Sequence, residues 1–187
     1  MSQVRPDFIK RVSLAHEALG LSVDILKQGV SGRSKQPLCE EAAELVSVGD
    51  DVFGRPQRLA PAAARAWSRL LEAAAKDNVS LQLVSAFRGV EYQRQLIERK
   101  LAAGQALDTI LTLSAAPGFS EHHTGNAVDV TTAGSTALEE EFESTQCFTW
   151  LQLNASRFGF SMSYPRDNPY GIAYEPWHWC FWGGEQG

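Results

Sequence analysis

The stretch PGFSEHHTGNAVD, residues 117–129, and the shorter stretch YEPWHW, residues 174–179, decide how this chain can fold and what it can bind. Together they hold three of the four histidines of the 187-residue chain. The first stretch runs into residues 126–130, which read as a strand, and the second runs into another strand over residues 177–181. Histidines concentrated beside carboxylates in two short segments indicate a metal site.

The first stretch offers two ligands that a tight turn can bring together. Zinc takes nitrogen and oxygen ligands, and a catalytic zinc site uses three protein ligands and leaves a fourth position for water. Thr124-Gly125 lies between His122 and Asp129, so a loop histidine can fold back beside a strand carboxylate. His122 and its neighbour His123 point apart, so only one of them should bind the metal, and spacing alone leaves that choice open.

The second stretch offers a third ligand and a carboxylate beside it. His178 alternates with two tryptophans, so its side chain can point into a cleft while the tryptophans pack on the other face. Glu175 precedes Pro176, which favours an extended backbone at Glu175. Its carboxylate can therefore lie next to the metal without binding it, where a general base takes a proton from water. A single histidine in an aromatic strand is more often a packing residue, but the clustering reverses that expectation.

Length, charge and cysteine content narrow the class of protein. The chain has 44% apolar residues and fits one globular domain that needs no disulfide or metal merely to fold. A net charge of −5, with no long run of Lys or Arg, argues against nucleic acid as a partner. Three scattered cysteines require no oxidising compartment. The start lacks the pattern of a signal peptide and no window resembles a transmembrane segment, so we expect a cytoplasmic protein.

The remaining elements predict an α+β fold. We expect a single domain with a central, largely antiparallel sheet and helices packed on one side of it, because the elements show no regular βαβ alternation. The expected helices cover residues 5–28 (broken at Gly20), 62–76, 89–103, 106–112 and 149–157, and the expected strands cover 45–48, 81–85, 126–130, 158–162 and 177–181.

Three motifs resemble one known family. SEHHTGNAVD, residues 120–129, resembles the S-x-H-x-x-G-x-A-x-D pattern of the VanY-type zinc D-Ala-D-Ala carboxypeptidases, and EPWH, residues 175–178, resembles their E-x-W-H. SAFRGVEYQ, residues 85–93, resembles their S-x-x-R-x-x-x-x-Q element. The likeness covers about residues 45–182 and implies a hedgehog/D,D-peptidase-like fold. We therefore divide the chain into an N-terminal helical extension, residues 1–40, and a catalytic domain, residues 41–187.

The resemblance implies a role for each matching residue. One zinc ion per chain would be held by His122, Asp129 and His178, which selects His122 over His123. Glu175 would activate water and then protonate the leaving amine, and Arg88 would stabilise the oxyanion. The expected substrate-binding residues are Ser120 and Gln93, which would hold the peptide or its terminal carboxylate, and Trp177 in the cleft wall.

The resemblance also implies a reaction. It predicts a zinc metallopeptidase that removes the C-terminal D-amino acid from peptidoglycan stem peptides or other short D-Ala-terminated peptides. Alternatives within the family are a D,D-dipeptidase, an L,D-carboxypeptidase acting on tetrapeptides, and a phage or effector peptidoglycan endopeptidase. An alternative of another class is a zinc-stabilised binding module, which could lose Glu175 or Arg88, whereas this chain has both.

Overall fold

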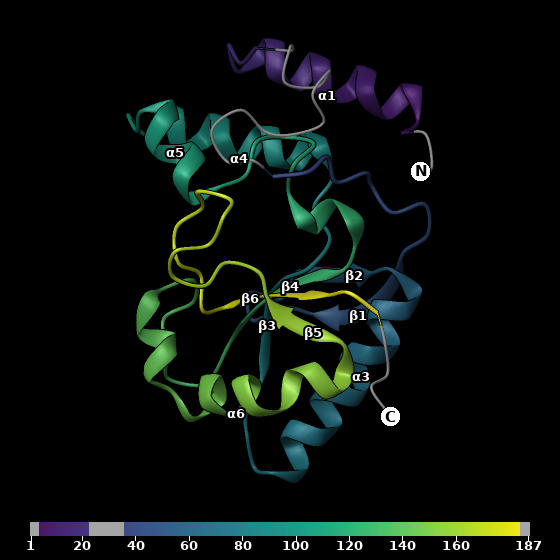
Figure 1. Ribbon diagram of the computed structural model, residues 1–187, viewed down its shortest axis with the longest axis vertical. Coiled ribbons are helices and arrows are strands. Elements are labelled where there is room, and N and C mark those ends of the chain that lie inside the picture. Colours follow the sequence, from purple (N-terminus) through teal and green to yellow (C-terminus); the bar gives the residue numbers. More distant parts are fainter. Residues whose placement is uncertain (1–3, 23–35, 184–187) are drawn as a thin grey trace.

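An antiparallel four-stranded sheet lies across the middle of the molecule. The computed structural model describes residues 4–22 and 36–183. The sheet has the order β3 (Gln82–Ser85), β4 (Ala127–Thr131), β6 (His178–Phe181), β5 (Phe160–Met162), with every neighbouring pair antiparallel (Figure 1). A separate antiparallel hairpin joins β1 (Val46–Asp50) to β2 (Pro56–Leu59). The two central strands, β4 and β6, carry the two stretches with which the sequence analysis began.

Two helices pack on one face of this sheet. They are α3 (Pro61–Lys76) and α6 (Gln146–Asn154), which lie below the sheet in Figure 1. Pro61 starts α3 at a position where its missing N–H is not needed, and the Ala- and Leu-rich sequence that follows favours the helix. Its buried residues recur at helical spacing and meet the inward side chains of β4, Val128 and Val130, in one hydrophobic core.

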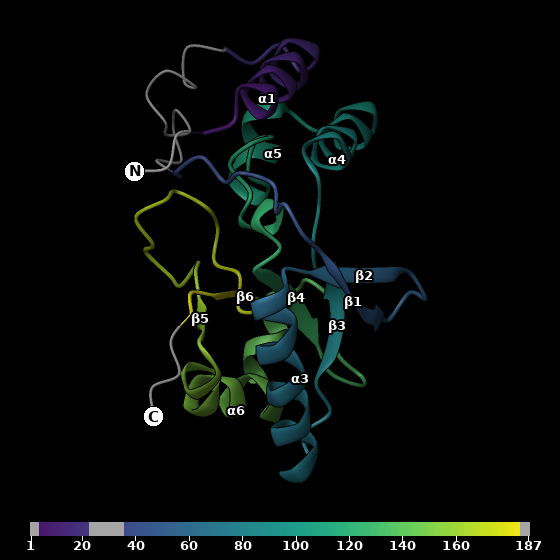
Figure 2. The ribbon, with the colours of Figure 1, turned by 90° about the vertical axis from the view of Figure 1, so that its right-hand side faces the viewer.

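Three other helices lie on the opposite side of the sheet and have apolar clusters of their own. They are α1 (Pro6–Ala18), α4 (Val90–Ala102) and α5 (Leu107–Leu113), grouped above the sheet in Figures 1 and 2. One cluster joins α1 to the start of α4, and a second joins the end of α4 to α5. Short 3₁₀ turns, η1 (Glu121–Thr124), η2 (Glu140–Ser144) and η3 (Ala155–Phe158), complete the fold.

The structure confirms the expected α+β class, with an antiparallel sheet and with α3 and α6 packed on one of its faces, while α1, α4 and α5 lie on the other side (Figure 1). The first helix is shorter than expected: it ends at Ala18, before Gly20 turns the chain with a φ of +68°, and residues 23–28 of the expected helix lie outside the described residues. β2 was not expected from the sequence: this Pro-Gln-Arg-Leu segment has little β propensity of its own and is a strand because it pairs with β1. Within residues 4–22 and 36–183 we find no helix long and apolar enough to cross a membrane.

Candidate active site

Two neighbouring strands and one turn bring three candidate ligands together. Asp129 of β4 lies directly opposite His178 of β6, and both side chains leave the sheet on the face opposite the α3/α6 core. The chain reaches β4 from η1, which carries His122, through Gly125 at a φ of +68°. A Cβ on Gly125 would lie 2.8 Å from the backbone nitrogen of Ala60, so only glycine fits this turn. The turn places His122 beside the two strand residues.

The hydrogen bonds of the two imidazole rings leave one nitrogen of each directed at Asp129. His122 donates from Nδ1 to the carbonyl oxygen of Ala86 at 2.6 Å, and its Nε2 lies 3.2 Å from Oδ1 of Asp129. His178 donates from Nε2 to Oε2 of Glu121 at 2.9 Å, and its Nδ1 lies 2.9 Å from the same Asp129 oxygen. We call His122, Asp129 and His178 the metal triad.

The metal triad has the donor set and spacing that a zinc ion needs. Its ligand atoms all lie within 4.8 Å of one another, and all three residues are buried. Two ring nitrogens without a proton, facing a carboxylate, repel it unless a proton or a cation lies between them. A tetrahedral zinc site places its ligand atoms about 3.3 Å apart, since each bond is about 2.0–2.2 Å long. The residues present therefore fit zinc.

A proton on His178 can take the place of that cation. Burial, with the positive charge of Arg88, lowers the pKa of His122 to about 4. Burial also disfavours the charged form of His178, but hydrogen bonds to Asp129 and Glu121 outweigh it and raise the pKa of His178 to about 10. The pKa of Asp129 falls well below its usual value, because both histidines and Arg88 outweigh the effect of burial. A metal ion must displace a proton from His178 to bind here.

Glu175 lies beside the metal triad on the turn that leads into β6. Its Oε2 is 3.9 Å from Nδ1 of His178, and its side chain is 13% exposed. Its backbone N–H donates to Tyr164 and its carbonyl accepts from the N–H of His178, which fixes the turn. Burial raises the pKa of Glu175 to about 7, although the positive charge of His178 works against it.

Arg88 reaches the metal triad from the loop after β3. Its Nη1 lies 3.6 Å from Oδ2 of Asp129. Its N–H donates to the carbonyl of His122, and its own carbonyl accepts from Nδ1 of His123. Because His123 also accepts the N–H of Gly118 at Nε2, both of its ring nitrogens are occupied away from the metal triad. His123 therefore braces the loops, and His122 is the histidine that faces the carboxylate.

The metal triad, Arg88 and Glu175 all open onto one cleft with a volume of about 450 Å³. The expected substrate-binding residues Ser120, Gln93 and Trp177 all line it, together with Arg88 and Glu175. Gln93 donates from Nε2 to the carbonyl of Ala115, and its buried Oε1 has no partner among the described residues.

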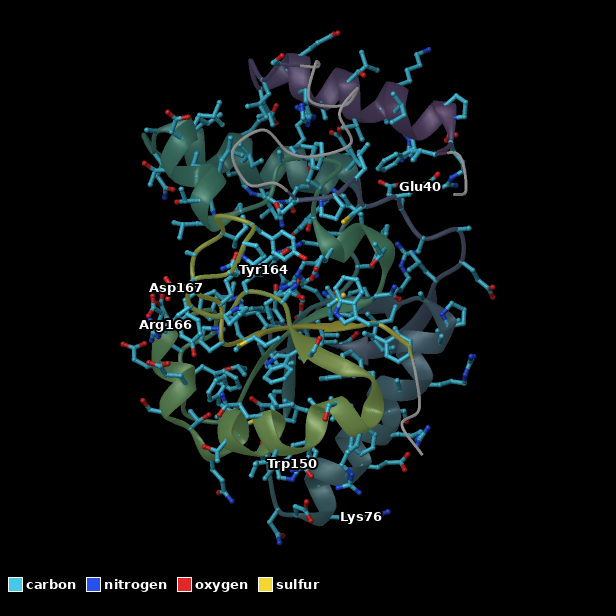
Figure 3. The ribbon with its side chains drawn as sticks, in the orientation of Figure 1. Glu40, Lys76, Trp150, Tyr164, Arg166 and Asp167 are labelled. Atoms are coloured by element: carbon cyan, nitrogen blue, oxygen red, sulfur yellow. The ribbon has the colours of Figure 1, made fainter. Side chains whose placement is uncertain are left out.

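Three residues of the candidate site, Glu121, Tyr164 and Lys100, were not expected from the sequence. Glu121 holds the outer nitrogen of His178, and only its place next to His122 could have suggested it. Tyr164 packs its ring on His178 at 4.7 Å between centroids and lies between the sheet and the helices above it (Figure 3). Lys100 lines the cleft from α4. Neither of the last two belongs to a recognisable motif.

Comparison with known proteins agrees with the architecture and the motifs. The family model VanY, D-alanyl-D-alanine carboxypeptidase, matches residues 56–184. A D-alanyl-D-alanine carboxypeptidase of Enterococcus faecalis is 34% identical over 126 residues, which cover 62% of this chain and 45% of that relative. The chain thus spans less than half the length of that relative. The bifunctional D-Ala-D-Ala dipeptidase and D-Ala-D-Ala carboxypeptidase VanXYC of Enterococcus gallinarum is 32% identical over 133 residues, 67% of each protein.

Solved structures share the fold. The LD-carboxypeptidase LdcB has a TM-score of 0.69 at 29% identity, covering 78% of this chain and 71% of LdcB. A mutant of the D,D-pentapeptidase VanY from the VanB-type resistance cassette, solved with Zn(II), has a TM-score of 0.64 at 28% identity, covering 82% of this chain and 86% of that one. These likenesses confirm the resemblance that the three motifs indicated. The chain belongs to the VanY D-alanyl-D-alanine carboxypeptidase family.

Proposed function

We propose that this protein is a zinc-dependent carboxypeptidase that hydrolyses the last peptide bond of short peptides ending in a D-amino acid, with peptidoglycan stem peptides and their precursors as substrates. The observation that carries the proposal is the meeting of a zinc-compatible triad, a carboxyl group with a pKa near 7 and an arginine in one cleft. A structural zinc site would need only the first of these.

Each group in the cleft has a property that suits hydrolysis. His122, Asp129 and His178 would hold one zinc ion per chain, and when bound the ion supplies a Lewis acid that polarises a carbonyl and lowers the pKa of water. Glu175 suits the general base, because a group with a pKa near 7 can both take a proton from water and return it to the leaving amine. Arg88 is a fixed positive charge whose buried Nε has no partner among the described residues, so it can donate to a developing oxyanion.

The substrate assignment draws on the relatives. The Enterococcus gallinarum relative is a D-Ala-D-Ala dipeptidase and carboxypeptidase, and VanYB, at 28% identity, has been solved with D-alanine-D-alanine. In this chain the free Oε1 of Gln93 can accept a substrate N–H, while Ser120 and Trp177 line the same cleft. A peptide that ends in D-Ala-D-Ala is the substrate we propose to test first.

A second candidate, an L,D-carboxypeptidase, is favoured by the likeness to LdcB, whose TM-score of 0.69 exceeds the 0.64 of the VanY structure. The two activities use the same catalytic groups and differ only in the residue before the scissile bond. A binding module without catalysis is a weaker candidate, because it has no use for an ionisable Glu175 beside the metal triad.

Mass spectrometry of products from the zinc-loaded protein tests these candidates. The substrates are the dipeptide D-Ala-D-Ala, a stem tetrapeptide and a stem pentapeptide. We expect loss of one D-Ala from the pentapeptide, whereas cleavage of the tetrapeptide alone would support the L,D-carboxypeptidase. Glu175→Gln should keep one zinc per chain and lose turnover, while the exposed control Glu72→Gln on α3 should keep both. Full turnover by Glu175→Gln, or no cleavage of any of the three peptides by the wild type, would refute the proposal.

A further inference from the structure

Helix α4 presents a row of side chains to the cleft that ends in a lysine. Gln93, Leu96 and Lys100 all line the cleft, and their spacing of three and four residues places them on one face of the helix. Lys100 is partly buried, and its Nζ donates to Oγ of Ser114, just after α5, at 2.7 Å. This ammonium group therefore points along the cleft wall.

A cleft that removes C-terminal residues has to accept a negative charge. The terminal carboxylate of the substrate leaves water on entering the cleft, and this is costly unless a cation meets it. Among the described residues, the cleft is lined by one arginine, Arg88, and one lysine, Lys100. Arg88 is already paired with Asp129 and is fixed by the backbone contacts of its own loop.

Among the residues that the structure describes, no carboxylate forms an ion pair with Lys100. The polar contact that the structure gives it is the neutral hydroxyl of Ser114, which uses one of the three ammonium protons. Burial lowers the pKa of Lys100, the positive charge of Arg88 lowers it further, and the negative charge of Glu175 raises it. Lys100 thus interacts electrostatically with both proposed catalytic groups, and all three line the same cleft.

We propose that Lys100 binds the C-terminal carboxylate of the substrate, so that the last peptide bond of the substrate lies over the metal triad. This inference rests on the proposed function and specifies how the cleft selects the end of a peptide. Ser114 orients the ammonium group from one side, and the two remaining ammonium protons are donated to the carboxylate.

The alternative explanation is that Lys100 only ties α4 to α5 through Ser114. The two explanations differ in what Ser114→Ala does. If Lys100 only links α4 to α5, removing the Ser114 hydroxyl should change substrate binding as much as removing the Lys100 ammonium group does. If Lys100 is an anchor, Ser114→Ala keeps the charge and should change substrate binding only a few-fold.

The test compares two ligands that differ only at the proposed contact, an N-acetylated L-Lys-D-Ala-D-Ala peptide with a free carboxylate and the same peptide with a C-terminal amide. Calorimetry on zinc-loaded protein in the Glu175→Gln background gives the ratio of the two dissociation constants without turnover. One charge-assisted hydrogen bond predicts a preference for the free acid of about 10- to 100-fold. Lys100→Met should reduce this ratio to near one and Lys100→Arg should keep most of it. In the active enzyme, Lys100→Met should mainly raise KM for the free acid.

Lys76→Met, at the far end of α3 (Figure 3), is the matched control and should leave the ratio unchanged. If Lys100→Met does not fold, as judged by thermal melting, Lys100→Gln replaces it. An unchanged acid preference in Lys100→Met, or no acid preference in the protein that retains Lys100, would overturn the inference. The binding ratio needs no hydrolysis, so loss of the proposed activity and failure of the lysine contact give separate results.

Discussion

The N-terminal helix packs closely against the active-site loop at Gly118, and Gly118→Ala should reveal how tightly the two are packed. Gly118 has a φ of +88°, and a Cβ there would lie 2.6 Å and 2.8 Å from the two γ-methyl groups of Val12 on α1. The loop cannot easily move away, because Gly118 donates its N–H to His123 and accepts the N–H of Cys39. Val12 is fully buried, so it has no free space either.

Two separate costs add up in this variant. Placing an L-residue in the left-handed region costs about 1–2 kcal/mol, and forcing a methyl group into a filled site costs about 1–3 kcal/mol. We expect Gly118→Ala to lower the free energy of unfolding by about 2–5 kcal/mol. Val12→Ala should cost about 1.5–3 kcal/mol through lost burial, and it also removes both methyl groups that the new Cβ would meet. The double variant should therefore be more stable than the sum of the single effects by about 1–3 kcal/mol.

Urea unfolding of the wild type, both single variants and the double variant measures this coupling. Additive effects, within about 0.5 kcal/mol, would refute the reasoning, because they would mean that α1 does not press on the loop. The result also bears on the division of the chain at residue 40, which stays a prediction. Strong coupling would mean that the N-terminal extension cannot be removed without disturbing the loop that leads to His122.

Three further predictions concern single contacts. In protein without zinc, the stability of Glu175→Gln relative to the wild type should rise by about 3 kcal/mol as the pH rises from about 4.5 to 7. The reason is that the Glu175 carboxyl group, whose pKa is raised in the folded wild type, must then bury a charge. Melting curves across this pH range measure the difference in stability, and a difference that stays constant with pH would contradict the prediction. Glu121→Gln should weaken zinc binding about 10- to 100-fold, because it weakens the hydrogen bond between Nε2 of His178 and the Glu121 side chain. Competition with a chelator measures the zinc affinity, and an unchanged affinity would argue against this role of Glu121. Thr145→Ala should cost about 1 kcal/mol in urea unfolding, because the Thr145 hydroxyl caps α6 by accepting the N–H of Phe148, and a neutral effect would mean that the cap is not needed.

The candidate ligands could be recognised from the sequence because local residue patterns reflect the geometry of strands and turns. His178 lies in a strand where alternate residues face opposite sides, and Gly125 is a residue that a reversing turn requires, so both could be recognised from local patterns. Such patterns carry no information on contacts between distant segments. Glu121 meets His178 across 57 positions, and Lys100 reads as one more charged residue on an amphipathic helix until α5 is seen beside it.

The two walls of the cleft belong to different hydrophobic cores. Asp129 and His178 lie on a sheet whose other face is packed by α3 and α6, and His122 lies on η1, while the facing wall rests on the small clusters among α1, α4 and α5. Mutations in α4 or α5 should therefore change the facing wall of the cleft with little effect on the strands that carry Asp129 and His178. A directed-evolution library confined to residues 93–114 should therefore change which peptides the proposed enzyme accepts while Asp129 and His178 keep their places.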